Sequence, residues 1–126
     1  MRAIKALIVD DSSVMRKIVE RSLRQAGVEL STVFEAGNGV EALESLRANP
    51  VDLIFSDINM PTMDGLEFVR QLKIQQLGRG VPVVMITTEG SESTVVEAIS
   101  NGARGYIRKP FTTEEVKERV LPLLDC

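Results

Sequence analysis

Short runs rich in valine and isoleucine alternate along this chain with longer segments whose apolar residues recur every three or four positions. The short runs predict β-strands at residues 5–9, 32–35, 51–56, 83–86 and 105–107. The segments between them predict helices, with apolar stripes through Val14, Ile18 and Leu23; Val40, Leu43 and Leu46; Leu66, Val69 and Leu72; Val95, Val96 and Ile99; and Val116, Val120 and Leu124. Strict alternation of strand and helix predicts an α/β fold, a parallel sheet covered on both faces by right-handed crossovers.

Residues that start and stop helices support this division of the chain. Candidate N-caps and stop signals stand at the expected boundaries: Ser12 or Ser13, Gly27, Asn49 with Pro50, Asp64, and Thr112 with Glu115 three residues later. No linker, low-complexity tract or longer repeat interrupts the pattern. With 126 residues, of which 44% are apolar, the chain has the size and composition of one core, so residues 1–126 are expected to form a single domain.

Polar side chains follow four of the predicted strands, near the point where each strand ends. Asp10 and Asp11 follow the first strand, Asp57 the third, Thr87 the fourth and Lys109 the fifth. The carboxyl ends of parallel strands meet at one edge of the sheet, where ligands bind. Three carboxylates gathered there would raise one another's pKa unless a cation neutralised them, and Mg²⁺ suits such oxygen ligands. Lys109 has one charge against three, so we expect it to hold an anion beyond the metal.

Each of these residues also has an ordinary structural explanation. Asp10 and Asp11 can cap the first helix, and Asp57 can open a turn. Thr87 can be a strand-end hydroxyl, and Lys109 can be a solvated surface charge. None of the residues is specific alone. What favours a shared site is that all of them fall at the same edge of one sheet.

Composition narrows the chemistry further. The chain has no histidine, which excludes Ser-His and Cys-His nucleophile pairs, histidine metal ligands and a phosphohistidine of its own. Its net charge of -3, without a Lys/Arg cluster, argues against nucleic acid as a partner. No apolar run approaches the roughly 20 residues of a membrane helix. The single cysteine, Cys126, is compatible with a reducing compartment, and we expect a cytoplasmic protein with no membrane partner.

Four segments of the chain resemble a known family. LIVDDSSVMRK, DLIFSDINMPTMDGLEFV, MITTEG and GYIRKPFT are similar to the receiver domain of two-component response regulators, and the resemblance spans essentially the whole chain. It is strongest to single-domain chemotaxis regulators of the CheY type. It implies a flavodoxin-like (βα)5 fold, doubly wound, with strand order 2-1-3-4-5. It also implies a signalling protein and not an enzyme, beyond accepting a phosphoryl group and hydrolysing it slowly.

The resemblance assigns roles to the residues at the sheet edge. Asp57 would be the phosphoacceptor, and Asp10, Asp11, Asp57 and the main-chain carbonyl of Asn59 would hold Mg²⁺. Thr87 and Lys109 would contact the phosphoryl oxygens, with the Lys109-Pro110 bond in the cis form.

The resemblance also implies a conformational switch and residues that set the lifetime of the phosphorylated state. Movement of Thr87 toward the phosphoryl group would let Tyr106 turn inward and change the face formed by the fourth helix, fifth strand and fifth helix. Packing in a strand is the ordinary alternative for Tyr106. Asn59 and Glu89 would flank the attacking water and set the lifetime of the phosphorylated state.

The implied partners are a histidine kinase as phosphodonor, a protein effector such as the flagellar motor switch, and a phosphatase. A phosphorelay or cell-cycle shuttle is the alternative pathway. An aspartate-nucleophile phosphatase is a second class, although the chain lacks a cap insert and a second acid two residues after Asp57. A receiver-like module that takes no phosphate is a third. A flavodoxin-like cofactor binder is disfavoured because the acidic, glycine-free loop DDSSVM would repel a cofactor phosphate.

Overall fold

The structure, a computed structural model, describes residues 3–88 and 91–124. These residues form one parallel sheet in the order β2-β1-β3-β4-β5. The strands are β1 (Ile4–Val9), β2 (Leu30–Ala36), β3 (Leu53–Asp57), β4 (Val83–Thr87) and β5 (Gly105–Arg108). The helices are α1 (Ser13–Gln25), α2 (Gly39–Ala48), α3 (Gly65–Gln75), α4 (Glu92–Ser100) and α5 (Thr113–Leu124). The predicted fold class and strand order are confirmed, with no strand bound more than two residues from its predicted place.

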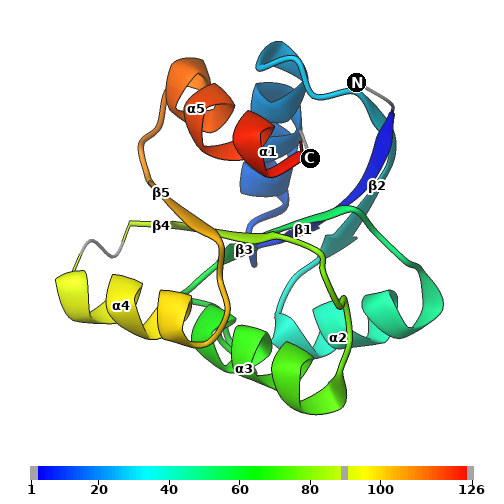
Figure 1. Cartoon of the computed structure of the whole chain (residues 1–126), viewed down its shortest axis with the longest axis vertical. Helices are drawn as coiled ribbons and strands as arrows, with labels where there is room; N and C mark the ends of the chain where they lie inside the picture. Colours follow the sequence, from blue (N-terminus) through cyan, green and yellow to red (C-terminus); the bar gives the residue numbers. More distant parts are fainter. Residues whose placement is uncertain (1–2, 89–90, 125–126) are drawn as a thin grey trace.

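Helices cover both faces of the sheet. Figure 1 shows α1 and α5 above one face and α2, α3 and α4 below the other. The three central strands are buried almost throughout, as expected for a parallel sheet between two helical layers. One layer of the core contains Leu7, Ile54 and Met85 on the face covered by α2 and α3. The other contains Ile8, Phe55 and Val84 on the face covered by α1 and α5.

The predicted helix stripes are wrong in part. In α1, Leu23 is buried as predicted, but Val14 and Ile18 are 69% and 42% exposed, and Val19 joins Leu23 in the buried row. In α4, Val96 and Ile99 are 56% and 47% exposed, and the buried residue is Ala98. Val40 of α2 is also exposed. Both α1 and α4 have two neighbouring apolar rows, and periodicity cannot choose between rows one residue apart, about 100° around the helix.

Most of the predicted caps are confirmed. Ser12 Oγ accepts a hydrogen bond from the Met15 N–H at 3.2 Å, and Asp64 Oδ1 accepts one from the Glu67 N–H at 2.9 Å. Thr112 and Glu115 form the reciprocal capping box, in which each side chain accepts from the other residue's N–H. The first helix ends before Gly27, whose φ of 96° is one that glycine adopts without strain. Among the described helices, none has the length and apolar content needed to cross a membrane.

Candidate functional site

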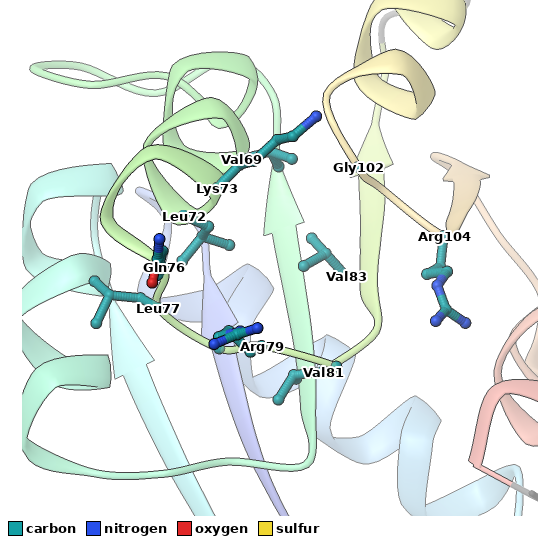
Figure 2. Close-up of a pocket in the computed structure, with 12 residues that line it drawn as sticks. Val69, Leu72, Lys73, Gln76, Leu77, Arg79, Val81, Val83, Gly102 and Arg104 are labelled. Carbon is teal, nitrogen blue, oxygen red and sulfur yellow. The ribbon is translucent and has the colours of Figure 1, made fainter.

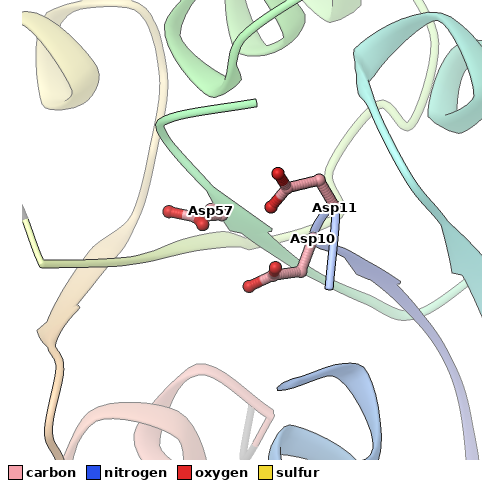
Figure 3. Close-up of side chains that lie close together, drawn as sticks. All are labelled: Asp10, Asp11 and Asp57. Atoms are coloured by element: carbon pink, nitrogen blue, oxygen red, sulfur yellow. The ribbon is translucent and has the colours of Figure 1, made fainter. Parts of the chain in front are cut away.

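Three carboxylates lie together where β1 and β3 end. Asp10 follows β1, Asp11 is the next residue, and Asp57 is the last residue of β3. The two strands are neighbours with Val9 opposite Ser56, so the residues after these partners emerge side by side. One oxygen from each carboxylate lies within 4.8 Å of the other two, and Figure 3 shows the three side chains extending to the same side. The predicted gathering of acids is therefore present in the fold.

The ammonium group of Lys109 lies directly against two of these acids. Its Nζ donates to Asp10 Oδ2 at 3.0 Å and to Asp57 Oδ2 at 3.2 Å. The Lys109 backbone N–H donates to the Thr87 carbonyl at 2.8 Å, and the Lys109-Pro110 peptide bond is cis, as expected. From charge counting alone, this lysine was expected to sit apart from the acids. The structure instead pairs it with the two buried carboxylates and leaves Asp11 exposed to water.

The remaining oxygens of the buried acids are fixed by the backbone. Asp57 Oδ1 accepts from the Ile58 N–H at 2.7 Å, and Asp10 Oδ1 accepts from the Ser12 N–H at 2.9 Å. Each of these carboxylates thus has one oxygen bound to a main-chain donor and the other to Lys109. Two-sided bonding of this kind holds a short side chain in one orientation.

Burial raises the pKa of Asp57. The charge of Lys109 lowers this pKa and the charge of Asp10 raises it, so the net shift remains upward. Burial lowers the pKa of Lys109, but hydrogen bonds and charges from Asp10 and Asp57 outweigh burial, and the net shift is upward. Lys109 therefore stays charged at neutral pH. The ionised Asp57 is held in an environment that disfavours it, which an additional cation would relieve.

The donor set fits a hard divalent cation. All three side chains offer carboxylate oxygens close enough to share one ion, and such ligands suit Mg²⁺, which keeps several waters as well. No nitrogen or sulfur ligand stands among them, which disfavours zinc and copper. Asn59, the fourth expected ligand through its carbonyl, lies exposed just beyond β3.

Two further residues bear on the site and were missed from the sequence. Arg16 of α1 donates from Nη1 to the Asp10 carbonyl at 2.6 Å and from Nε to Glu35 Oε1 at 2.8 Å. The arginine thereby ties the backbone of the acid pair to the end of β2. Its neighbour Lys17 also bonds Glu35, and the hydrogen bonds from Lys17 and Arg16 lower the pKa of that carboxyl. No local sequence pattern predicts these contacts of Arg16, because they depend on how α1 lies over β2.

Gly65 is the second missed residue. Its N–H donates to the Ile58 carbonyl at 2.7 Å, so the first residue of α3 packs directly against the backbone that follows β3. A Cβ at this position would lie 2.1 Å from the Asp57 carbonyl oxygen. The only sequence signal is a glycine at the first helical position after Asp64, where helices do not usually need one. Gly65 therefore sets how closely α3 approaches Asp57.

Comparison with known proteins decides the family. A family model described as the response regulator receiver domain matches residues 6–121. The chain belongs to this family. Receiver domains of this kind are generally signalling proteins and not enzymes, and they typically bind Mg²⁺ at an acidic pocket like the one described above.

Several relatives of this receiver domain are named chemotaxis proteins. Chemotaxis protein CheY1 of Helicobacter pylori is 42% identical over 118 residues, which cover 93% of this chain and 94% of the relative. A CheY homolog of Campylobacter jejuni is 40% identical over 122 residues, covering 96% and 92%. Among solved structures, Vibrio cholerae CheY4 is 37% identical with a TM-score of 0.84, covering 98% of this chain and all 100% of that one. The predicted likeness to CheY-type regulators is confirmed.

The expected switch residues, Thr87 and Tyr106, lie on the neighbouring strands β4 and β5. Thr87 ends β4, is fully buried and pairs in register with Arg108 of β5. Tyr106 is half-buried on β5, in register with Met85 of β4. Thr87 thus adjoins the strand that carries Tyr106. Glu89, the expected lifetime residue, lies outside the described residues.

Proposed function

We propose that this receiver domain is a phosphorylation-dependent regulator that accepts a phosphoryl group on Asp57 from a histidine kinase. The observation that carries the proposal is the arrangement around that carboxylate. Asp57 is buried, one of its oxygens is 3.2 Å from the Lys109 ammonium, and two more acids lie within reach of a shared cation. A nucleophile of this type needs fixed orientation and nearby positive charge more than it needs a general base.

The transfer step conserves the phosphoryl group. An oxygen of the Asp57 carboxylate attacks phosphorus, the phosphorus–nitrogen bond of the donor phosphohistidine breaks, and the imidazole leaves and takes a proton from water. The product is an aspartyl phosphate. Lys109, released from Asp57, pairs with a phosphoryl oxygen while staying within reach of Asp10.

Asp10, Asp11, Asp57 and the Asn59 carbonyl would hold Mg²⁺, which when bound supplies charge neutralisation for the phosphoryl oxygens. Water later attacks the same phosphorus, the bond to Asp57 breaks, and inorganic phosphate leaves. Asn59 and Glu89 control the approach of that water and so set the lifetime.

Output follows from a change in population between two states of one face. In the phosphorylated state, Thr87 bonds a phosphoryl oxygen and frees space for Tyr106 to turn inward. The face changed by this movement includes α4, where the apolar side chains of Val96 and Ile99 already stand exposed. A protein effector binds this face. Because several relatives are named chemotaxis proteins, we place the effector in chemotaxis, with the flagellar motor switch as the partner and the cytoplasm as the location.

Intact-protein mass spectrometry tests the phosphorylation step. Acetyl phosphate with Mg²⁺ should add one phosphoryl group to the chain, and chelation of the metal should prevent the addition. Asp57→Asn should abolish it. Ser56→Ala is the matched control, because Ser56 is the adjacent buried hydroxyl, and this variant should still be modified. A phosphoryl group that persists in Asp57→Asn, or brisk turnover of phosphomonoesters, would instead support a phosphatase or another acceptor.

The pathway needs a separate test. Deletion of the gene in its own host should bias swimming direction and spare growth if the protein serves chemotaxis. Altered cell-cycle timing with normal swimming would move the assignment to the shuttle alternative.

A further inference from the structure

A pocket of about 400 Å³ opens at the edge of the sheet opposite the carboxylates. It lies between the end of α3, the loop into β4 and the turn between α4 and β5. Its floor includes Val69, Leu72 and Val83, and its cationic side chains are Lys73, Arg79 and Arg104. Figure 2 shows Val83 near the centre, with the three cations arranged around it.

All the charged side chains that line this pocket are positive. The chain has 18 acids against 15 bases, yet no acidic residue lines the pocket. Across the described part of the chain, none of the three cationic side chains forms an ion pair or a hydrogen bond. Five other cations of the described chain do pair with carboxylates: Arg16, Lys17, Arg24, Arg70 and Lys109. The pocket therefore concentrates positive charge that no residue lining it neutralises.

The lining indicates the chemistry of a ligand. Two guanidinium groups and one ammonium favour a multiply charged oxyanion, and the planar fork of arginine matches phosphate well. The apolar floor adds a place for a part of the ligand that carries no charge. A volume of about 400 Å³ lies within the usual range of small-molecule sites, roughly 300–1,000 Å³. Gly102 at the rim adds no side chain that would close the mouth.

We propose that this pocket binds a small phosphate-bearing molecule with an apolar body, of about the size of a mononucleotide. The site is separate from the acid cluster. Val83 begins β4 and lines the pocket, whereas Thr87 ends the same strand beside the carboxylates. The two sites thus lie at opposite ends of the parallel strands, and occupation of one leaves the other open.

Calorimetric titration of the protein with adenosine monophosphate tests this proposal, with adenosine and inorganic phosphate as the two partial probes. The mononucleotide should bind more tightly than either part, and its affinity should fall as salt is raised. Saturation with Mg²⁺ and beryllium fluoride should leave the affinity unchanged.

Three single substitutions, Lys73→Gln, Arg79→Gln and Arg104→Gln, should each weaken binding about fivefold or more, since each removes one charged, solvent-screened partner of the phosphate. All three side chains are exposed, so the variants should fold normally. Arg21→Gln makes the same change of charge on α1, outside the pocket, and should bind like the parent.

Several results would overturn the proposal. They are no binding at millimolar nucleotide, equal binding of inorganic phosphate and the mononucleotide, or equal weakening by the Arg21 control. Binding of a glutamate-rich peptide in place of the nucleotide would also overturn it and assign the pocket to an acidic protein segment.

Discussion

Replacement of Gly65 by alanine tests how closely α3 packs against the strand that carries Asp57. The added Cβ would meet the Asp57 carbonyl oxygen at 2.1 Å and the Ile58 Cα at 2.8 Å. Both neighbours are backbone atoms, so neither can rotate away. The start of α3 must therefore retreat, and the hydrogen bond from the Gly65 N–H to the Ile58 carbonyl must lengthen or break.

The expected cost follows from these contacts. Overpacking of a close contact costs about 1–3 kcal/mol, and the strained hydrogen bond adds about 1 kcal/mol. Alanine recovers about 0.5–1 kcal/mol through its better helix propensity. The net loss is about 1–3.5 kcal/mol, a substantial share of the roughly 5–15 kcal/mol that stabilises such a domain. At about 4 °C per kcal/mol for a domain of this size, Tm should fall by about 4–14 °C.

Urea unfolding followed by circular dichroism measures this loss, and two other glycines serve as controls. Gly37→Ala would place its Cβ 3.6 Å from the flexible Glu41 side chain and should be nearly neutral. Gly80→Ala meets nothing within 4 Å but has φ of +77°, so it should cost about 1 kcal/mol from backbone strain alone. If Gly65→Ala proves no more costly than Gly37→Ala, the close approach of α3 to Asp57 is wrong.

Three other outcomes are expected. With a chelator present, Asp57→Asn should raise Tm at neutral pH, because burial raises the pKa of Asp57 and its ionised form therefore costs stability. Lys109→Met should lower Tm, because it leaves Asp10 and Asp57 without their cation. Thermal melts in which either change of Tm had the opposite sign would contradict these expectations. Because the pKa of Glu35 is lowered in the folded protein, the stability it contributes is present above the ordinary pKa of 4.5 and is lost as pH falls through the folded pKa. Glu35→Gln should therefore weaken the dependence of the unfolding free energy on pH in the acid range. An unchanged dependence would show that the ion pairs of Glu35 with Arg16 and Lys17 contribute nothing. Tyr106 is the only tyrosine and the chain has no tryptophan, so intrinsic fluorescence reports on this ring alone. Beryllium fluoride with Mg²⁺ should change the emission of Tyr106 and its quenching by iodide, and Thr87→Ala should weaken that change. An intact response in Thr87→Ala would show that Thr87 does not couple the acid site to Tyr106.

The sheet was predictable because its signal is redundant. Strands buried on both faces are continuous apolar runs, and each is followed by residues that end it, so the predicted bounds of β3 and β4 lie within two residues of the observed ones. The same topology predicts that Asp10 lies beside Asp57, since neighbouring parallel strands end together.

What the sequence could not supply depends on side-chain rows and on contacts between distant elements. Val14 and Val19 of α1 belong to adjacent rows of similar character, and only the packing against the sheet makes the second one buried. The direct pairing of Lys109 with Asp10 was missed because charge counting ignores which carboxylates are buried. The close approach that requires Gly65 arises from a fit between two backbones, which no local pattern records.

The contact between Lys109 and Asp10 joins residues 99 positions apart, from the loop after the first strand to the loop after the last. During synthesis on the ribosome, the acids therefore emerge long before their cation does. A nascent chain that has not yet made β5 carries the carboxylates without the ammonium that orients Asp57. The cluster of buried acids and ammonium is thus complete only once β5 has docked against β4.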